Sequence, residues 1–279
     1  MKFSLSELPR YIINFFLFLW VLFTITMFGW LILTSFKSTR EIYQGVFAFP
    51  NEFLIDNYIR VLTDFAMLRY MFNSLVAVLT ATVVVLVIAT PVAYVLGKLK
   101  FFGQGPVSFS IIIGLGIPLQ AIFIPLYLMM ARAGFTDSLL GLSWLYAITS
   151  FPFTVYLLIG FFKTIPSTLE DAARVDGATA FQSFIKIMVP LARPGIISAG
   201  IFVFVMLWKE FLLSLVFISE SSIQPISLGL YSLITRLTYT GDWGGLFAGV
   251  VLVMLPSIVF YSILAKRFIA GLTVGIGKS

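Results

Sequence analysis

The stretch MFNSLVAVLTATVVVLVIATPVAYVLG, residues 71–97, decides the fold class of this chain. It runs for 27 residues without a charged side chain, and about 20 mainly apolar residues are enough for a helix to cross the hydrocarbon core of a bilayer. Four other uncharged stretches are of similar length: 11–36, 101–131, 138–162 and 243–265. A sixth, 194–219, reaches that length only by including Lys209 and Glu210. The sequence therefore predicts an all-α, polytopic membrane protein with six transmembrane helices.

The composition of the whole chain agrees with this prediction. Of the 279 residues, 60% are apolar and 11% are charged, whereas a soluble domain is about 45–50% apolar and about a quarter charged. The chain has neither cysteine nor histidine, which excludes disulfides, thiolate or imidazole metal sites and histidine-based nucleophilic catalysis. The net charge of +6 is explained by the basic residues that membrane proteins carry in their cytoplasmic loops, and it does not require a nucleic-acid partner. We therefore expect a protein that is not an enzyme and that binds no nucleic acid.

Lysine and arginine positions predict the orientation, because cytoplasmic loops hold an excess of both residues. With the N-terminus inside, 11 of the 18 fall on the cytoplasmic side and six outside, with Lys209 within a span. We therefore expect both termini in the cytoplasm. The first span, 11–36, is too long for a signal-peptide core and lacks a cleavage pattern, so we expect a signal anchor. We expect three parts. Residues 1–69 hold an N-terminal helix and an extracytoplasmic segment with a short amphipathic helix near 58–62. Residues 70–265 form the transmembrane core, and 266–279 a cytoplasmic tail.

The loop at 163–193 is unusually long for a connection between packed helices, which indicates a function. Ser167 and Glu170 have the spacing of a capping box, which predicts the start of a short helix. Gly177 can adopt the left-handed conformation that ends helices. A second amphipathic helix is predicted from apolar residues at i, i+3, i+4 and i+7, and Pro190 is expected to stop it; the apolar residues are Phe181, Phe184, Ile185 and Met188.

Two interpretations of this helical pair remain open from the residues alone. Ala172 and Ala173 form a shallow surface that charged residues surround, and such a surface suits docking into a groove on a partner. Alternatively, the pair lies on the lipid surface. The acidic residues disfavour the second interpretation, because helices on a lipid surface are usually rich in lysine and arginine.

The loop resembles the EAA signature of binding-protein-dependent ABC importer permeases. The resemblance is carried by Asp171-Ala172-Ala173, Gly177, Ile187 and Val189-Pro190 in the family's spacing, with Asp171 where Glu is usual and Val189 where Leu is usual. Asp176-Gly177-Ala178 resembles the extension found in the carbohydrate branch. The likeness to the MalG-like subunit extends over nearly the whole chain, through Ser35-Phe36-Lys37, Asn57-Tyr58, Asn73-Ser74-Leu75, Ile124-Pro125-Leu126-Tyr127 and Gly271-Leu272-Thr273.

The resemblance implies a type I ABC importer transmembrane fold in a bacterial inner membrane. Its implied partners are a second homologous permease subunit, two ATPase subunits, an extracytoplasmic solute-binding protein and membrane lipid. This chain would hold no cofactor, and the ATPase subunits would bind ATP and Mg. The loop would be the coupling helix that contacts an ATPase, with these candidate residues: Glu170, Asp171, Ala172, Ala173, Arg174, Asp176, Gly177, Ala178 and Pro190.

The fifth predicted span contains the adjacent charges Lys209 and Glu210, placed a little outward of mid-membrane. A charge there is costly, so each side chain needs a partner or water. We expect both to face the solute pathway together with Trp208, whose ring could stack on a sugar. The segment resembles a Trp-Asn-Glu-Phe stretch of sugar permeases, from which Lys209 departs. Alternatively, the pair is structural and satisfied by a partner subunit.

Other classes of membrane protein fit the sequence less well. A channel would be expected to show a filter sequence or an arginine-rich sensor helix, and neither is present. An intramembrane enzyme would need converging acids, and the spans offer Glu210 alone. A self-contained secondary transporter of a small polar solute remains the alternative, although no convincing internal repeat relates the two three-helix halves.

Overall fold

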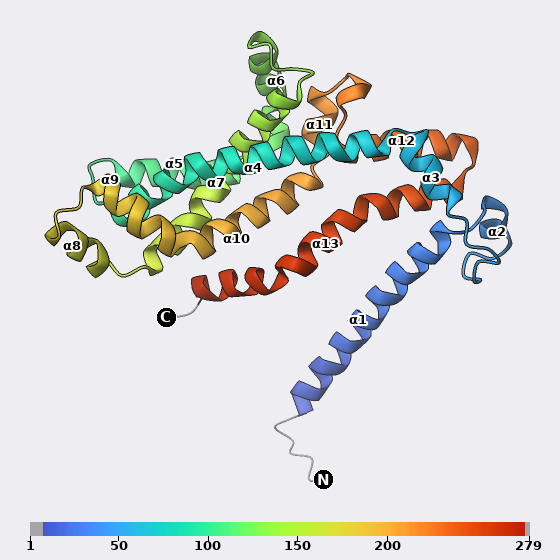
Figure 1. The fold of residues 1–279 in the computed structure, drawn as a ribbon, viewed down its shortest axis with the longest axis horizontal. Coiled ribbons are helices and arrows are strands. Elements are labelled where there is room, and N and C mark those ends of the chain that lie inside the picture. Colours follow the sequence, from blue (N-terminus) through green and yellow to red (C-terminus); the bar gives the residue numbers. More distant parts are fainter. Residues whose placement is uncertain (1–7, 277–279) are drawn as a thin grey trace. The chain divides into compact units, whose positions relative to one another are not determined.

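The computed structural model describes the backbone of residues 8–276 and the side chains of residues 10–260 and 262, and every regular element within it is a helix (Figure 1). The longer elements are α1 (Leu8–Ser35), α3 (Asp56–Thr63), α4 (Met67–Lys98), α5 (Gln104–Gly116), α6 (Phe123–Arg132), α7 (Leu139–Thr164), α8 (Thr168–Val175), α10 (Val189–Trp208), α12 (Ile226–Thr240) and α13 (Trp243–Ile276). The short elements are α2 (Thr39–Gln44), η2 (Leu119–Ile122), α9 (Ala180–Ser183), η3 (Phe184–Met188), α11 (Leu212–Phe217) and η4 (Ser221–Ile223). The final residues of the predicted tail, 277–279, lie outside the described part.

Four of the six predicted spans are confirmed as single long helices, namely α1, α4, α7 and α13. By length and composition, the described part of the chain has five helices that could cross a membrane, or six if one bent pair is counted as a span. The short helix expected near 58–62 is confirmed as α3. The connection expected at 220–242 instead contains the 15-residue helix α12.

The third predicted span, 101–131, is wrong as a single helix. Its two halves, Gln104–Gly116 and Leu119–Arg132, are bent by 98°. Pro118 explains the break, because the proline ring disfavours helical dihedrals at the preceding residue. Ile117 is accordingly extended, with φ −77° and ψ 118°.

The fifth predicted span, 194–219, begins earlier and ends earlier than expected. Apolar helix runs from Ala180 to Trp208 through α9, η3 and α10. Lys209 leaves helical geometry with φ −94° and ψ 4°, and the separate six-residue helix α11 follows. The charged pair therefore lies at the end of a long helix and not within one.

The chain forms two compact units. Unit 1 contains the described residues up to Leu68 together with Leu230–Leu255, and unit 2 contains Arg69–Gly229 and the described residues from Pro256 onward. In unit 1, the amide of Asn57 donates hydrogen bonds to the carbonyls of Ser35 and Lys37, both at 2.9 Å. These bonds fix the turn at the end of α1 to α3.

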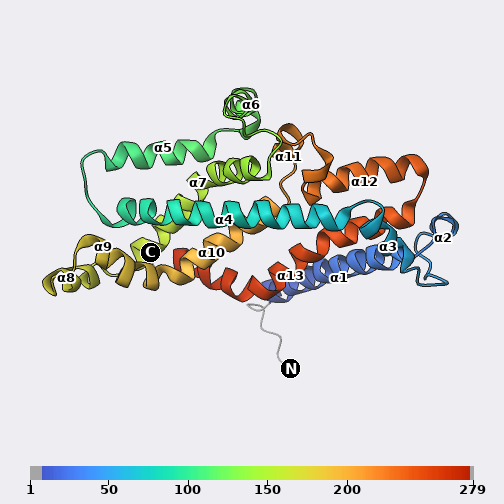
Figure 2. The ribbon, with the colours of Figure 1, turned by 45° about the horizontal axis from the view of Figure 1, so that its top comes forward.

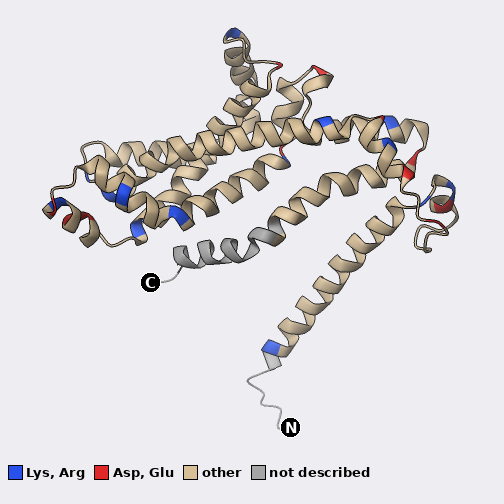
Figure 3. Ribbon diagram, in the orientation of Figure 1, with Lys and Arg blue, Asp and Glu red and all other residues tan. Residues whose placement is uncertain are grey.

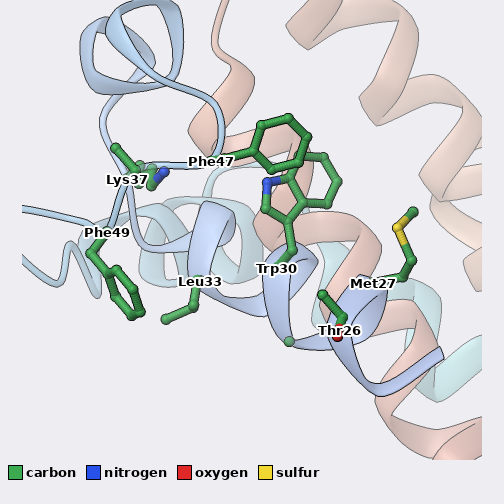
Figure 4. Close-up of a pocket in the computed structure, with 9 residues that line it drawn as sticks. Thr26, Met27, Trp30, Leu33, Lys37, Phe47 and Phe49 are labelled. Atoms are coloured by element: carbon green, nitrogen blue, oxygen red, sulfur yellow. The ribbon is translucent and has the colours of Figure 1, made fainter. Parts of the chain in front are cut away.

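A buried lysine closes the same turn of unit 1. Lys37 is only 1% exposed, and its ammonium donates to the carbonyls of Gly45 and Val46 at 3.3 and 3.1 Å. The indole of Trp30 donates to the same Val46 carbonyl at 3.0 Å. Beside Lys37 is a mainly apolar pocket of about 370 Å³, which α1 and the following loop line and whose labelled side chains are drawn in Figure 4.

Unit 2 is built on close packing of α4, α7 and α10. A Cβ added at Gly195 of α10 would lie 2.4 Å from the ring of Phe161 on α7, so these helices approach more closely than larger residues would allow. A Cβ added at Gly200 of α10 would lie 2.9 Å from a methyl carbon of Leu86 on α4. Figure 2 shows these three helices, with α8 and α9 at one end of the unit.

Charges gather at the two ends of unit 2 and are sparse along the helices between them (Figure 3). Loops predicted on the same side of the membrane lie together. Lys98 donates to the carbonyl of Ile165, joining two loops predicted inside. The carboxylate of Asp137 accepts from the backbone N–H of Glu220 at 2.9 Å, joining two loops predicted outside. These contacts agree with the predicted pairing of the loops, and the side of the membrane on which each pair lies stays a prediction.

Candidate functional site

The predicted turn at Gly177 is confirmed and has a defined hydrogen-bond pattern. Gly177 has φ +81°, and the N–H of Gly177 donates to the carbonyl of Arg174 at 3.1 Å. The N–H of Ala178 donates to the carbonyl of Ala173 at 2.9 Å. These two bonds form a Schellman motif, which satisfies carbonyls at the end of a helix and requires a left-handed residue at the glycine position. The motif therefore joins Gly177 and Ala178, which follow α8, to the last turn of that helix by two hydrogen bonds.

The predicted capping box at the start of α8 is wrong. Ser167 has helical dihedrals of φ −67° and ψ −21° and makes no side-chain cap bond. Glu170 is buried, and its carboxylate instead accepts a 2.7 Å hydrogen bond from the hydroxyl of Tyr94 on α4. A tertiary partner has displaced the local one.

A capping box does occur at the next helix start, where the sequence analysis overlooked it. The N–H of Gln182 donates to the hydroxyl of Thr179 at 3.2 Å, and the N–H of Thr179 donates to the amide oxygen of Gln182 at 2.9 Å. The Thr-x-x-Gln spacing was the available signal. The box starts α9 directly after the Schellman motif.

Pro190 does not stop the second helix, contrary to prediction. The π-helical segment η3 precedes it, and the N–H of Val189 reaches back five residues to the carbonyl of Phe184. Pro190 then occupies the first turn of α10, where a missing N–H costs little. The amphipathic helix therefore continues into the membrane span.

The candidate coupling residues that lie on α8 divide between its two faces. Glu170 and Ala173 are buried, at 9% and 5% exposure. Val175 is 87% exposed, a feature that the sequence analysis did not single out. The other candidates are largely open to solvent: Asp171, Ala172, Arg174, Asp176, Gly177 and Pro190 are exposed and Ala178 is partly so. Arg174 and Asp171 form an ion pair at 3.7 Å on this outer face.

The candidate pathway residues have three different environments. Trp208 is 3% exposed and its ring stacks on Phe204 at 5.8 Å, so the indole is not open to a solute in this structure. Glu210 caps α11, accepting from the N–H groups of Leu213 and Ser214 at 2.8 and 3.2 Å. Lys209 is exposed.

The opposite end of unit 2 is organised by polar residues that the sequence analysis did not assign. Asp137 has φ +49°, and its N–H donates to the carbonyl of Phe217 at 3.0 Å. The amide of Asn73 donates to the carbonyls of Ser222 and Gln224 at 3.1 and 3.0 Å. These bonds hold the start of α4 and the turns after α6 and α11 in one assembly.

Together, the long apolar helices and the exposed helix α8 at one end of unit 2 define a multi-pass membrane protein. The model of the family described as binding-protein-dependent transport system inner membrane component matches residues 89–274. The chain belongs to this family.

Several curated permeases are similar over most of their length. The diacetylchitobiose uptake system permease protein NgcG of Streptomyces coelicolor is 30% identical over 93% of this chain and 86% of its own. The trehalose transport system permease protein SugB of Mycobacterium tuberculosis is 30% identical over 89% and 90%. The sulfoquinovosyl glycerol transport system permease protein SmoH of Agrobacterium fabrum is 30% identical over 88% and 86%.

A solved structure has the same fold. It is the crystal structure of a bacterial ABC transporter involved in the import of the acidic polysaccharide alginate. The TM-score is 0.84 at 24% identity, and the match covers 96% of this chain and 99% of that chain. The predicted type I importer fold is therefore confirmed.

Proposed function

We propose that this chain is a pore-forming subunit of an ATP-driven importer for a sugar or oligosaccharide. The observation that carries the proposal is α8, a helix closed by a Schellman motif at one end of unit 2 and exposed on its outer face. The named substrates of three relatives, diacetylchitobiose, trehalose and sulfoquinovosyl glycerol, support a carbohydrate.

The chain itself supplies the pore, and its partners supply the energy and the substrate. Two ATPase subunits bind ATP and Mg on the cytoplasmic side, a second permease of similar fold completes the pathway, and a solute-binding protein delivers sugar outside. Both termini of this chain lie in the cytoplasm. The basic residues on the predicted inner loops support this orientation.

The outer face of α8 is the surface that fits an ATPase groove. It combines the exposed apolar side chain of Val175 with the charged pair Asp171 and Arg174. The apolar side chain can anchor in a pocket while the charges select the orientation of the partner. When ATP closes the ATPase dimer, α8 moves as a rigid body and the pathway opens outward by alternating access.

Lys209 is the pathway candidate that the geometry favours. It is exposed and adjacent in sequence to Glu210, whose carboxylate caps α11, at the break between α10 and α11. A break in a helix at membrane depth is tolerated where the backbone is covered by protein or lines a water-filled cavity. An exposed ammonium there suits a hydroxyl-rich or acidic sugar, whereas the buried Trp208 holds the helix end in place.

Co-purification of the chain with its permease, ATPase and binding-protein partners tests the proposal. ATP hydrolysis by the complex is then measured with and without each candidate sugar and its binding protein. Stimulation by a sugar-loaded binding protein is the expected result. Solute transport by the purified chain alone without ATP would support the secondary-transporter alternative and overturn the proposal.

A further inference from the structure

Glu170 and Asp171 are adjacent acids with opposite environments. Asp171 is exposed beside Arg174, whereas Glu170 is 9% exposed and turned toward α4. There the hydroxyl of Tyr94, itself 6% exposed, donates to the Glu170 carboxylate at 2.7 Å. Glu170 therefore lies on the inner face of α8, away from the surface that we assign to the ATPase.

Tyr94 also contacts the segments on both sides of α8. Its ring lies 5.7 Å from that of Phe162, near the end of α7, and 4.9 Å from that of Phe184, at the start of η3. One turn further along α4, Lys98 donates to the carbonyl of Ile165 in the linker that leads into α8. The last turns of α4 thus contact the chain before, within and after the coupling segment.

The hydrogen bond to Glu170 differs in kind from the surrounding contacts. Aromatic contacts are weakly directional and allow sliding, whereas a hydrogen bond to a carboxylate, shielded from water, is short, directional and strong. Among the described residues, it is the side-chain hydrogen bond that joins α8 itself to a membrane-spanning helix. Because this bond joins α8 to α4, a displacement of α8 relative to α4 must either move α4 with it or break the bond.

We propose that the Tyr94–Glu170 hydrogen bond transmits the movement of α8 to α4. This inference rests on the proposed function. It makes Tyr94 and Glu170 positioning residues, which act through α8 and do not contact the ATPase. The exposed face of α8 receives the movement, and the buried face passes it to the membrane-spanning helix α4.

Tyr94→Phe is the sharpest variant, because it removes one oxygen atom and leaves both ring contacts. Tyr156→Phe is the matched control, since Tyr156 is 55% exposed on α7. In the complete importer, Tyr94→Phe is expected to retain bound ATPase subunits and basal ATP hydrolysis. Sugar transported per ATP is expected to fall about fivefold or more, the usual range of a coupling between sites. Tyr156→Phe should leave both quantities unchanged.

A double-variant comparison tests whether the two side chains act together. Glu170→Gln keeps the size of the side chain and weakens the hydrogen bond by removing its charge. If the bond carries the transmission, Tyr94→Phe and Glu170→Gln combined should lower transport per ATP no further than the more damaging single change. Losses that multiply would show that the residues act independently, which contradicts the proposal.

A spectroscopic readout separates transmission from mere stabilisation. The chain has no cysteine, so Leu169→Cys on α8 and Val87→Cys on α4, both at exposed sites outside the surface assigned to the ATPase, can each carry a single probe. ATP should alter both probe signals in the unmodified background. With Tyr94→Phe, we expect the α8 probe to respond and the α4 probe to respond weakly.

Three outcomes would overturn the inference. One is a normal ATP response of the α4 probe in Tyr94→Phe together with normal transport per ATP. Another is loss of assembly in Tyr94→Phe, which would make the bond a structural contact. The third is a Tyr94→Phe protein in which the α8 probe no longer responds to ATP while the α4 probe responds normally. Absence of ATP-dependent sugar uptake in the unmodified complex would instead refute the proposed function, so the two failures are distinguishable.

Discussion

The N–H of Ala178 donates to the carbonyl of Ala173 across 2.9 Å, joining two short sequence motifs in one hydrogen bond. Ala173 belongs to the Asp-Ala-Ala triplet and Ala178 to the Asp-Gly-Ala triplet that follows. The spacing between the triplets is thus the spacing that a Schellman motif requires. The sequence pattern has a local structural cause in addition to any contact with a partner.

Gly177→Val is expected to abolish most transport and weaken ATPase association while the protein still inserts. A Cβ at Gly177 would meet no atom within 4 Å, so the harm comes from φ +81°, which is strained for a branched residue. Gly177→Asn should be milder because asparagine tolerates the left-handed region. Gly160→Val, at a helical glycine with open space around its Cβ position, is the control. Equal transport by the Gly177→Val and Gly160→Val variants would contradict the role of the turn.

Lys37→Met is expected to destabilise unit 1 by about 1–3 kcal/mol, because the Gly45 carbonyl loses its ammonium donor and the Val46 carbonyl loses one of two donors. The melting temperature of the purified protein measures the effect. Lys100→Met changes an exposed lysine in the same way and should leave the melting temperature within about a degree. A Lys37→Met protein as stable as this control would show that the buried ammonium is not holding the loop.

Acid is expected to loosen the turn around α2. Hydrogen bonds from the backbone N–H groups of Ser38 and Asn51 lower the pKa of Glu41 from 4.5 to about 2. A lowered folded-state pKa gives stability that is present above about pH 4.5 and is lost as the pH falls through about 2. Hydrogen exchange of residues 38–51 should therefore accelerate over that window.

Glu41→Gln should remove this acid dependence, because the amide does not titrate. Ser38→Ala should keep most of it, since the carboxylate and both backbone donors remain. The same acid acceleration in Glu41→Gln as in the unmodified protein would assign the effect to another group.

Lys209→Asn is expected to change the preference among sugars while leaving assembly intact. Its exposed ammonium lies at the break after α10, and removing the charge should weaken the uptake of acidic sugars most. Competition between acidic and neutral sugars in an uptake assay measures the effect. Identical uptake of every sugar by both proteins would mean that Lys209 does not belong to the pathway.

Glu210→Ala should act differently from Lys209→Asn. It removes the carboxylate that accepts from Leu213 and Ser214, so α11 should lose its cap at a cost of about 1 kcal/mol. Glu210→Gln retains acceptor capacity and should be less damaging. A larger loss for Glu210→Gln than for Glu210→Ala would contradict a capping role.

The sequence predicted the spans well where apolar length alone decides the outcome. Residues 71–97 and 139–162 lie within single long helices, and neither Pro91 nor Pro152 interrupts its helix. Pro118 ends α5 and Pro190 does not end its helix, although both are prolines preceded by apolar residues. The difference depends on the π-helical turn before Pro190, which periodicity does not reveal.

In the candidate site, the sequence predicted the turn at Gly177 but not the tertiary contact between Glu170 and Tyr94. Gly177 was identifiable because left-handed glycines at helix ends have a local signature. The burial of Glu170 depends on Tyr94, which lies 76 residues away, and a capping-box spacing with Ser167 pointed to a local partner. A single sequence carries no signal for such a long-range pair.

The most direct test of the central claim is sugar uptake by proteoliposomes that contain the complete importer, measured with and without ATP on the ATPase side. We predict uptake only when ATP and the sugar-loaded binding protein are both present, and loss of that uptake with Gly177→Val. Uptake by this chain without ATP, or unchanged ATP-driven uptake with Gly177→Val, would contradict this prediction.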